Sequence, residues 1–555
     1  MSKQIDSLQR FLVARFWFTF AIFATIFFSG CATDIRSLEK FAHIYYEQDA
    51  KNASEFALKK ADSKDLLWNL QAGISAYTAN NPNALDLLEK SENLFSKYEG
   101  EGLLTKGGAQ AGATLVNDNA MSYRGNMYEG VFLNYYKALA QMETSNADSI
   151  NSTRVELNRA NDRQRRAKDY YAKQINKAIN DENERYAQSS ARGVVDRENS
   201  QRRASRELES TYANLAQFRA FDGFINPAVS YISGLFFALQ GDSKGIDYLK
   251  ESYGITQSET IAQDLLYFSS TDFEANLKSS KEFLTTLSSS QSEVNNADLD
   301  LLDSSKFYTW IILEEGRQMR KSEFRFSLPL ITTNGLYHFG IALPQLKDGI
   351  SFAKHYTIES KQNSTQSSQD FNKSDSSEFF ELANTDKIIA TEFEKQLNAI
   401  LARAFVSASL KVATQLGLSK GLGQVNSGLG LLGSIFGSAY SALSTNADLR
   451  IASVLPKRIL LAKIPNTMTK QTTKAKKDSS EFAIYADKSS IATLDFTLQS
   501  CQTILHTTST DDTTKEITHK KHAKNPALSL CPYTHNIIYL RHTKSKTYYK
   551  ILFSR

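Results

Sequence analysis

The chain has 555 residues, of which 41% are hydrophobic and 11% aromatic, and its formal net charge is +5. That much apolar material can build buried cores, which excludes a wholly disordered tether. The small net charge gives no reason to expect nucleic acid as a partner.

The first 30 residues have the pattern of an export signal. Lys3, Arg10 and Arg15 make the start basic, and Phe16–Phe28 follows without a charged residue. This apolar run is well short of the roughly 20 residues that a membrane-spanning helix needs. Two small residues then precede Cys31, which predicts a signal peptide over residues 1–30 that is cleaved before Cys31. The alternatives are an uncleaved anchor helix or a chance cysteine after an apolar run.

The segment around Cys31 resembles the lipobox of bacterial lipoproteins. That resemblance implies acylation of the Cys31 thiol, and each buried methylene of an acyl chain contributes about 0.8 kcal/mol to membrane binding. Ala32 follows the cysteine, and Asp34 comes too late to act as the usual inner-membrane retention signal. We therefore expect a chain anchored in the bacterial cell envelope, at the outer membrane and facing the periplasm.

Two further cysteines remain if Cys31 carries lipid. Cys501 and Cys531 form an even pair in a compartment where disulfides persist. Closing a loop of about 30 residues is worth roughly 3 kcal/mol in the loop-entropy description. We expect a disulfide between them, with two unpaired thiols as the alternative.

Residues 31–255 have helical periodicity, and helix–turn–helix units of about 34 residues predict a domain of tetratricopeptide-like repeats. An aromatic stripe at helical spacing includes Tyr128, Tyr135 and Tyr136, and Tyr231 lies in a later apolar helix. Such a stripe is usually core. The alternative is that these four tyrosines line a groove for a partner.

Residues 151–217 differ from their surroundings because charged and amide side chains dominate them. They predict a long charged helical arm, either two helices folded back or one extended helix. A charge-rich helix is most often a solvated face. A projecting contact arm is the alternative.

The rest of the chain predicts a smaller α+β part, so the expected fold class is mainly α with an α+β domain. A helical connector over 256–300 leads into this domain at 301–488, where Glu314-Glu315-Gly316 suggests a turn after a buried strand. An amphipathic helix over 385–415 precedes an uncharged segment, 417–443, whose regular glycines favour a packed helical hairpin over a membrane span. Residues 489–555 read as a strand-rich C-terminal extension.

No catalytic or cofactor motif stands out in the chain. Gly421-Leu422-Gly423 lacks the third glycine of a dinucleotide fingerprint. His519 and His522 are three residues apart, but their basic, loop-like surroundings favour surface histidines over metal ligands. We predict no enzyme activity, no cofactor, no metal and no small-molecule substrate.

Several segments together resemble an uncharacterised bacterial family of envelope lipoproteins with tetratricopeptide-like repeats. The resemblance runs in order through most of the mature chain, and it is carried by residues 128–139, 158–164, 226–242, 323–344, 388–410 and 447–456. It implies an envelope role and no established activity.

We therefore expect a non-enzymatic, membrane-anchored scaffold for envelope protein partners. Tyr128, Tyr135, Tyr136 and Tyr231 are the expected partner-binding residues, because stacked helix pairs present concave binding surfaces. A subunit of an envelope export or assembly complex is the second hypothesis. A cell-wall glycan hydrolase is the third, and it needs a carboxylate pair for which only Glu314 and Glu315 are candidates.

Overall fold

The computed structural model describes residues 35–101, 122–144, 146–213, 215, 224–271, 273–279, 282, 304–361, 376–425, 447–466, 480–497, 499–501 and 527–554. The predicted signal peptide, Cys31, most of the glycine-rich segment and His519 with His522 lie outside these residues. The expectation of a mainly helical chain with a smaller α+β part is confirmed, with three small sheets beside the helices.

Short helices form one layer of the body. They are a helix over 35–47, α2 (Ala50–Lys60), α3 (Leu66–Thr78), α4 (Ala84–Glu101), α6 (Met127–Met142), α9 (Pro227–Leu239), α10 (Lys244–Thr256) and α11 (Glu259–Phe268). Local signals set their ends: Asp65 caps α3 by accepting a bond from the Trp68 N–H, and Pro227 opens α9 after the cap Asn226. Neighbours in the chain, such as α9 and α10, pack against each other.

A five-stranded sheet lies against this helical layer. Its order is β13 (Thr547–Ser554), β12 (Asn536–His542), β2 (Tyr308–Glu315), β8 (Arg458–Pro465) and β7 (Phe380–Asn384). Successive side chains of a strand point to opposite faces. Accordingly Trp310 and Ile312 join the core shared with the helices, whereas Ile311 and Leu313 join a second core on the other face.

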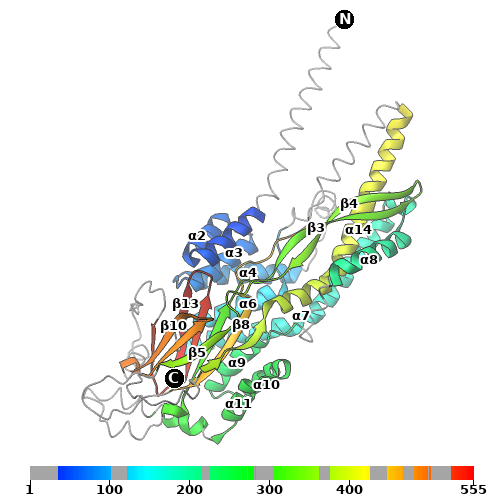
Figure 1. Cartoon of the computed structure of the whole chain (residues 1–555). Helices are drawn as coiled ribbons and strands as arrows, with labels where there is room; N and C mark the ends of the chain where they lie inside the picture. The colour runs from blue at the N-terminus through cyan, green and yellow to red at the C-terminus, as the bar shows by residue number, and fades with distance from the viewer. Residues whose placement is uncertain are drawn as a thin grey trace, which may run out of the picture.

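A second five-stranded sheet covers that other face. Its order is β11 (Ala527–Leu530), β10 (Ser489–Phe496), β9 (Ser480–Ala486), β5 (Tyr356–Lys361) and β6 (Ser376–Glu378). Helices and the second sheet thus cover opposite faces of β2 and its neighbours. Figure 1 shows strands of both sheets, such as β8 and β10, beside the helices. One hydrophobic core contains residues from both the expected repeat domain, 31–255, and the expected α+β domain, 301–488. These two parts are therefore not separate domains.

The C-terminal strands are integral to both sheets and do not form an extension. The boundary expected between residues 488 and 489 falls inside the turn of the β9–β10 hairpin, whose strands pair antiparallel. Further on, β12 inserts between β13 and β2, parallel to β2. Separate local patterns could not reveal this, because strand order depends on contacts far apart in the chain.

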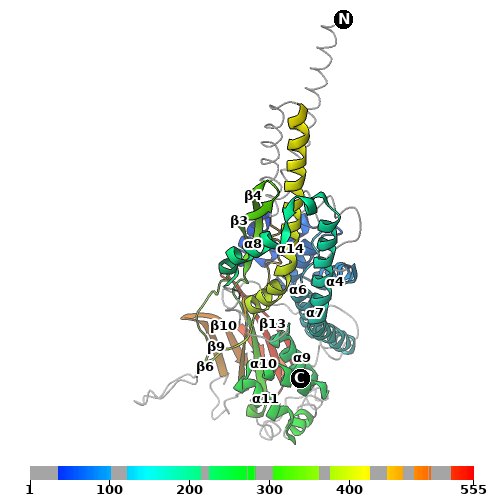
Figure 2. The ribbon, with the colours of Figure 1, turned by 90° about the vertical axis from the view of Figure 1, so that its right-hand side faces the viewer.

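Three stretches of the chain combine into an elongated rod that we call the projection. It contains α7 (Ala147–Ala187), a short 3-10 turn with β1 (Val195–Asp196), α8 (Arg197–Tyr212), the hairpin of β3 (Arg320–Thr332) and β4 (Gly335–Lys347), and α14 (Thr385–Val425). Figures 1 and 2 show α14 running along the rod and beyond the hairpin. A helix of 41 residues, the length of both α7 and α14, spans roughly 60 Å at 1.5 Å per residue.

The predicted arm is therefore present as two helices, but it does not stand alone. An apolar core of its own holds the projection together, with Tyr186 from α7, Leu208 from α8, Leu330 and Phe339 from the hairpin, and Val406 from α14. The polar helices supply only part of this core. The amphipathic helix and the hairpin, more than 100 residues later in the chain, supply the rest, as their residue numbers show.

α14 confirms the helix expected over 385–415 and continues to Val425, into the predicted glycine-rich hairpin. Residues 426–443 of that hairpin lie outside the described residues. Among the helices that the structure describes, Thr385–Leu416 is the one long and apolar enough to cross a bilayer, judged by length and composition alone. Packing against α7 and β4 also accounts for its apolar side chains.

Candidate functional site

The four tyrosines expected to bind a partner are core residues. Tyr128, Tyr135, Tyr136 and Tyr231 are between 0 and 3% exposed. The predicted partner-binding surface is wrong, and the alternative of an aromatic core stripe is confirmed. The physical reason is that the sheet around β2 covers the face of α6 and α9 that the sequence alone leaves open.

Tyr136 instead belongs to a buried polar cluster around Glu314. The hydroxyls of Tyr136 and Tyr539 donate to Glu314 Oε2 at 2.7 and 2.9 Å, and Arg541 Nη1 lies 3.8 Å from the same oxygen. Glu314 and Arg541 are both fully buried. Burial raises the pKa of Glu314, and the positive charge of Arg541 opposes this rise. The cluster therefore binds the helical layer to the sheet through a charge pair with hydrogen-bonded neighbours.

Glu314 and Glu315 do not form a catalytic pair. The expected turn at these residues is wrong, because both end strand β2 and the reversal follows at Gly316, whose φ is +76°. As neighbours in a strand they face opposite ways. Glu315 accepts hydrogen bonds from Arg458 and from the Phe352 N–H, on the far side of the sheet from Glu314. Both side chains are buried, so the pair does not face a cleft in which a glycan could lie.

Tyr231 bonds to a second buried carboxylate, Asp264 of α11. The Tyr231 hydroxyl donates to Asp264 Oδ2 at 2.5 Å, and Trp310 Nε1 donates to Oδ1 at 3.2 Å. Lys463 Nζ completes the site with an ion pair of 2.6 Å to Oδ1. This cluster joins α9 and α11 to strands β2 and β8, which is a structural role.

A third cluster lies where α6 begins and meets the projection. Glu392 of α14 accepts a bond of 2.5 Å from the Tyr171 hydroxyl of α7, and the backbone N–H groups of Met127 and Tyr128 face its carboxylate. Burial is the largest effect and raises the pKa of Glu392 to about 8. A carboxyl with that pKa is largely protonated at neutral pH, so this junction between body and projection carries a titratable group.

The arginines of α7 are mostly paired with the body. Arg163 is buried and contacts Glu92 and Glu99 of α4 at 3.0 and 3.2 Å. Arg154 and Arg165 pair with acidic residues beside α10. Exposed arginines in the described part of the projection include Arg192, Arg202, Arg203 and Arg206. Exposed basic side chains therefore occur on both arm helices, and on α8 Arg202 and Arg203 pair with Glu198 and Glu207 of the same helix.

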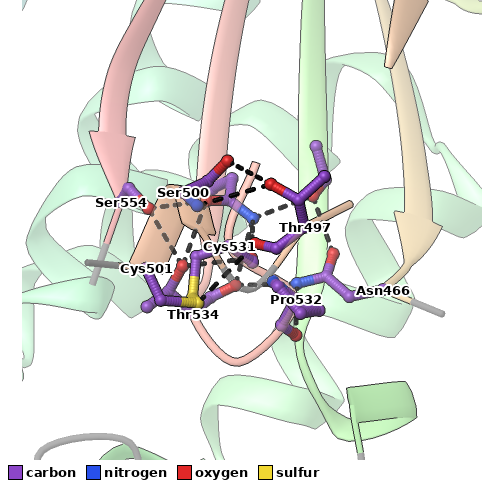
Figure 3. The surroundings of a disulfide bond; sticks show 10 residues. Asn466, Thr497, Ser500, Cys501, Cys531, Pro532, Thr534 and Ser554 are labelled. Carbon is purple, nitrogen blue, oxygen red and sulfur yellow. Dashed lines mark hydrogen bonds between the residues drawn. A yellow bond between two sulfur atoms is a disulfide. The ribbon is translucent and has the colours of Figure 1, made fainter. Parts of the chain in front are cut away.

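The predicted disulfide between Cys501 and Cys531 is present, and Figure 3 shows its surroundings. It joins the chain just after β10 to the chain just after β11. Nearby, the Asn466 side chain donates to the carbonyl oxygens of Pro532 and Thr534, at 3.1 and 2.7 Å. The bond therefore fixes the ends of two paired strands beside a hydrogen-bonded loop.

One shallow hollow of about 420 Å³ lies on the surface beside α4, lined by Ser63, Asp86, Glu89, Lys90, Asn93 and Leu94. Across the described ranges, no three His, Cys, Asp or Glu side chains are grouped so that they could hold a metal ion. The hollow has charged and neutral walls without a buried polar group aimed into it.

Comparison with family models, with curated proteins and with solved structures finds no match for the chain. The resemblance to envelope lipoproteins therefore rests on the sequence motifs. Sequence reasoning missed Arg541, Asp264 and Glu392 as buried charges. The sequence does show that Arg541 and Glu314 each follow an apolar run that forms a strand. When these strands, β12 and β2, pair in parallel, the two residues lie opposite each other.

Proposed function

We propose that the chain is a non-enzymatic scaffold of the bacterial cell envelope, tethered through a lipid on Cys31 and facing the periplasm. In this proposal the helix pairs of the body are tetratricopeptide-like repeats, and the contact region is the projection, not the buried tyrosine stripe. The observation that carries the proposal is the projection itself, because three separate stretches of the chain build a rod that extends away from the body.

Two further observations support the proposal. The disulfide between Cys501 and Cys531 suits an oxidising compartment outside the cytoplasm. Exposed arginines around α8 offer charges to a partner, and such charges contribute to recognition and to the rate of association.

The anchor is tested by feeding cells a clickable palmitate analogue and following the full-length protein. We expect label on the wild type and on Cys501→Ser, and none on Cys31→Ser. A wild-type chain without label that keeps its first 30 residues would overturn the anchor.

The contact region is tested by photo-crosslinking in intact cells. A photoreactive residue replaces Arg206 on α8, and the matched control replaces Lys59, which is also exposed but lies on the body in α2. We expect discrete adducts with an envelope protein from position 206 only. Equal adducts from both positions, or none from position 206, would remove the projection as the contact region.

A second candidate function is a subunit of an envelope export or assembly machine. The length and apolar character of Thr385–Leu416 favour it, since such a helix could meet lipid in a complex. Alkaline carbonate extraction of a Cys31→Ser variant, in which a cleavable export signal without a lipidation site replaces residues 1–30, distinguishes the two candidates. Release of this variant from membranes supports the lipid-tethered scaffold, and retention supports an inserted α14.

A further inference from the structure

The β3–β4 hairpin of the projection has two outer edges with opposite chemistry. In an antiparallel pair, alternate residues direct their backbone groups away from the partner strand. The Ile331 N–H donates to Ser200 Oγ at 2.8 Å, away from β4, and the Pro344 carbonyl accepts a bond of 3.0 Å from Tyr212, away from β3. With the observed register, the backbone N–H and C=O groups of odd-numbered residues of β3 and of even-numbered residues of β4 therefore point away from the partner strand, toward the outer edges of the hairpin. We call these the outward residues.

The outer edge of β3 is protected in the way that sheet edges usually are. Charged side chains and proline at outward positions prevent another strand from pairing with an edge. The outward residues of β3 are Lys321, Glu323, Arg325, Ser327, Pro329 and Ile331. β1 then pairs beside Ile331 and Thr332, which closes the end of this edge.

The outer edge of β4 lacks that protection over most of its length. Its outward residues before Pro344 are Leu336, His338, Gly340 and Ala342, and no Asp, Glu, Lys or Arg occurs between Leu336 and Leu346. Among the strands that the structure describes, none besides β3 pairs with β4. α14 contacts β4, for example through the Tyr337 hydroxyl, which donates to Gln415 at 3.2 Å, while Leu336, His338 and Gly340 are exposed.

We propose that this edge of β4, which no other described strand pairs with, pairs antiparallel with the same edge of a second copy of the chain. The inference goes beyond the scaffold function and stands whether or not Cys31 carries lipid. A two-fold axis beside Phe339 sets Leu336 opposite Ala342 of the second copy, and His338 opposite Gly340. The two three-stranded sheets then continue into one another across the axis.

The choice of a second copy rests on charge and size. Like charges directly opposite each other destabilise a strand pair, and identical edges avoid them only when they carry no charge. In the symmetric register each large outward side chain meets a small one. Pro344 falls opposite Asn334 of the second copy, where the partner strand has already ended in its turn. The proline therefore limits the ladder without interrupting it.

Sedimentation velocity of the full-length protein in mild detergent, over a range of concentrations, tests the pairing. The variants are Gly340→Lys and Gly340→Pro on the free edge, with Ser327→Lys and Ser327→Pro as matched controls. Ser327 is the cross-strand neighbour of Gly340, and both are exposed and outward-facing. A Cβ at Gly340 meets no atom within 4 Å, so Gly340→Lys leaves the single chain undisturbed even if the proline variant fails to fold.

We expect a concentration-dependent dimer of the wild type, at least tenfold weaker association of both Gly340 variants, and unchanged association of both Ser327 variants. A wild type that remains monomeric at the highest concentration overturns the proposal. So does an equal loss of association in the Gly340 and Ser327 series.

Discussion

Arg541 is the residue whose replacement tests the account of the core most directly. It is fully buried where the first helix, the sheet and the segment before β8 meet. Its guanidinium donates to the Tyr45 hydroxyl at 3.3 Å and to the Val454 carbonyl at 3.1 Å, and it neutralises Glu314. Arg541→Met keeps the length and most of the packing of the side chain while it removes the charge and the hydrogen-bond donors.

The expected loss of stability follows because both partners of the ion pair, Arg541 and Glu314, are buried. Removing one partner of a buried ion pair costs about 3–5 kcal/mol, because the other charge is left without compensation. We expect Arg541→Met and Glu314→Gln each to lower the free energy of unfolding by about that amount. The double variant contains no buried charge at this place, so it should lose much less than the sum of the single losses.

Urea unfolding followed by circular dichroism at pH 7 measures these differences. Arg203→Met is the control, because Arg203 is exposed and lies 3.7 Å from Glu207 on the same helix. Exposed pairs of this kind contribute about 0–1 kcal/mol. A loss below about 1 kcal/mol for Arg541→Met, or additive losses in the double variant, would refute the reasoning.

Three further predictions concern other parts of the structure. Burial raises the pKa of Glu392 to about 8, so the stability that this group contributes is complete below about pH 4.5 and is lost as the pH rises through 8. Between pH 5 and pH 8.5 the melting temperature should therefore fall less for Glu392→Gln than for the wild type. Equal decreases in the two proteins would contradict this. Replacing both Cys501 and Cys531 by Ser should cost roughly 3 kcal/mol in urea unfolding, since the bond closes a loop of 30 residues, and a reducing agent should then have no further effect. Gly245→Ala should lower the melting temperature, because the added Cβ would lie 2.4 Å from a backbone nitrogen of α9. Gly254→Ala in the same helix has free space around its Cβ and should leave the melting temperature unchanged. Similar shifts for both variants would argue against the close packing of α10 on α9.

Local patterns were enough to predict much of the secondary structure. The apolar run before Glu314 predicted strand β2, and helical periodicity predicted the apolar helix of Tyr231, which is α9. Cysteine count and spacing predicted the disulfide. Each of these predictions depends on a few neighbouring residues or on the number and spacing of the cysteines, and both can be read directly from the sequence.

The tertiary structure alone decided what covers each face and each edge. Tyr136 has the same helical spacing whether it lines a groove or a core, and only the sheet packed on α6 makes it core. Likewise β12 takes its place parallel to β2, and the polar arm gains its apolar partners from α14 and the hairpin. The sequence by itself determines which residues share a face of an element, because that follows from helix and strand periodicity. Which other element packs against that face depends on contacts between residues far apart in the chain, and the helix or strand periodicity of a segment does not specify them.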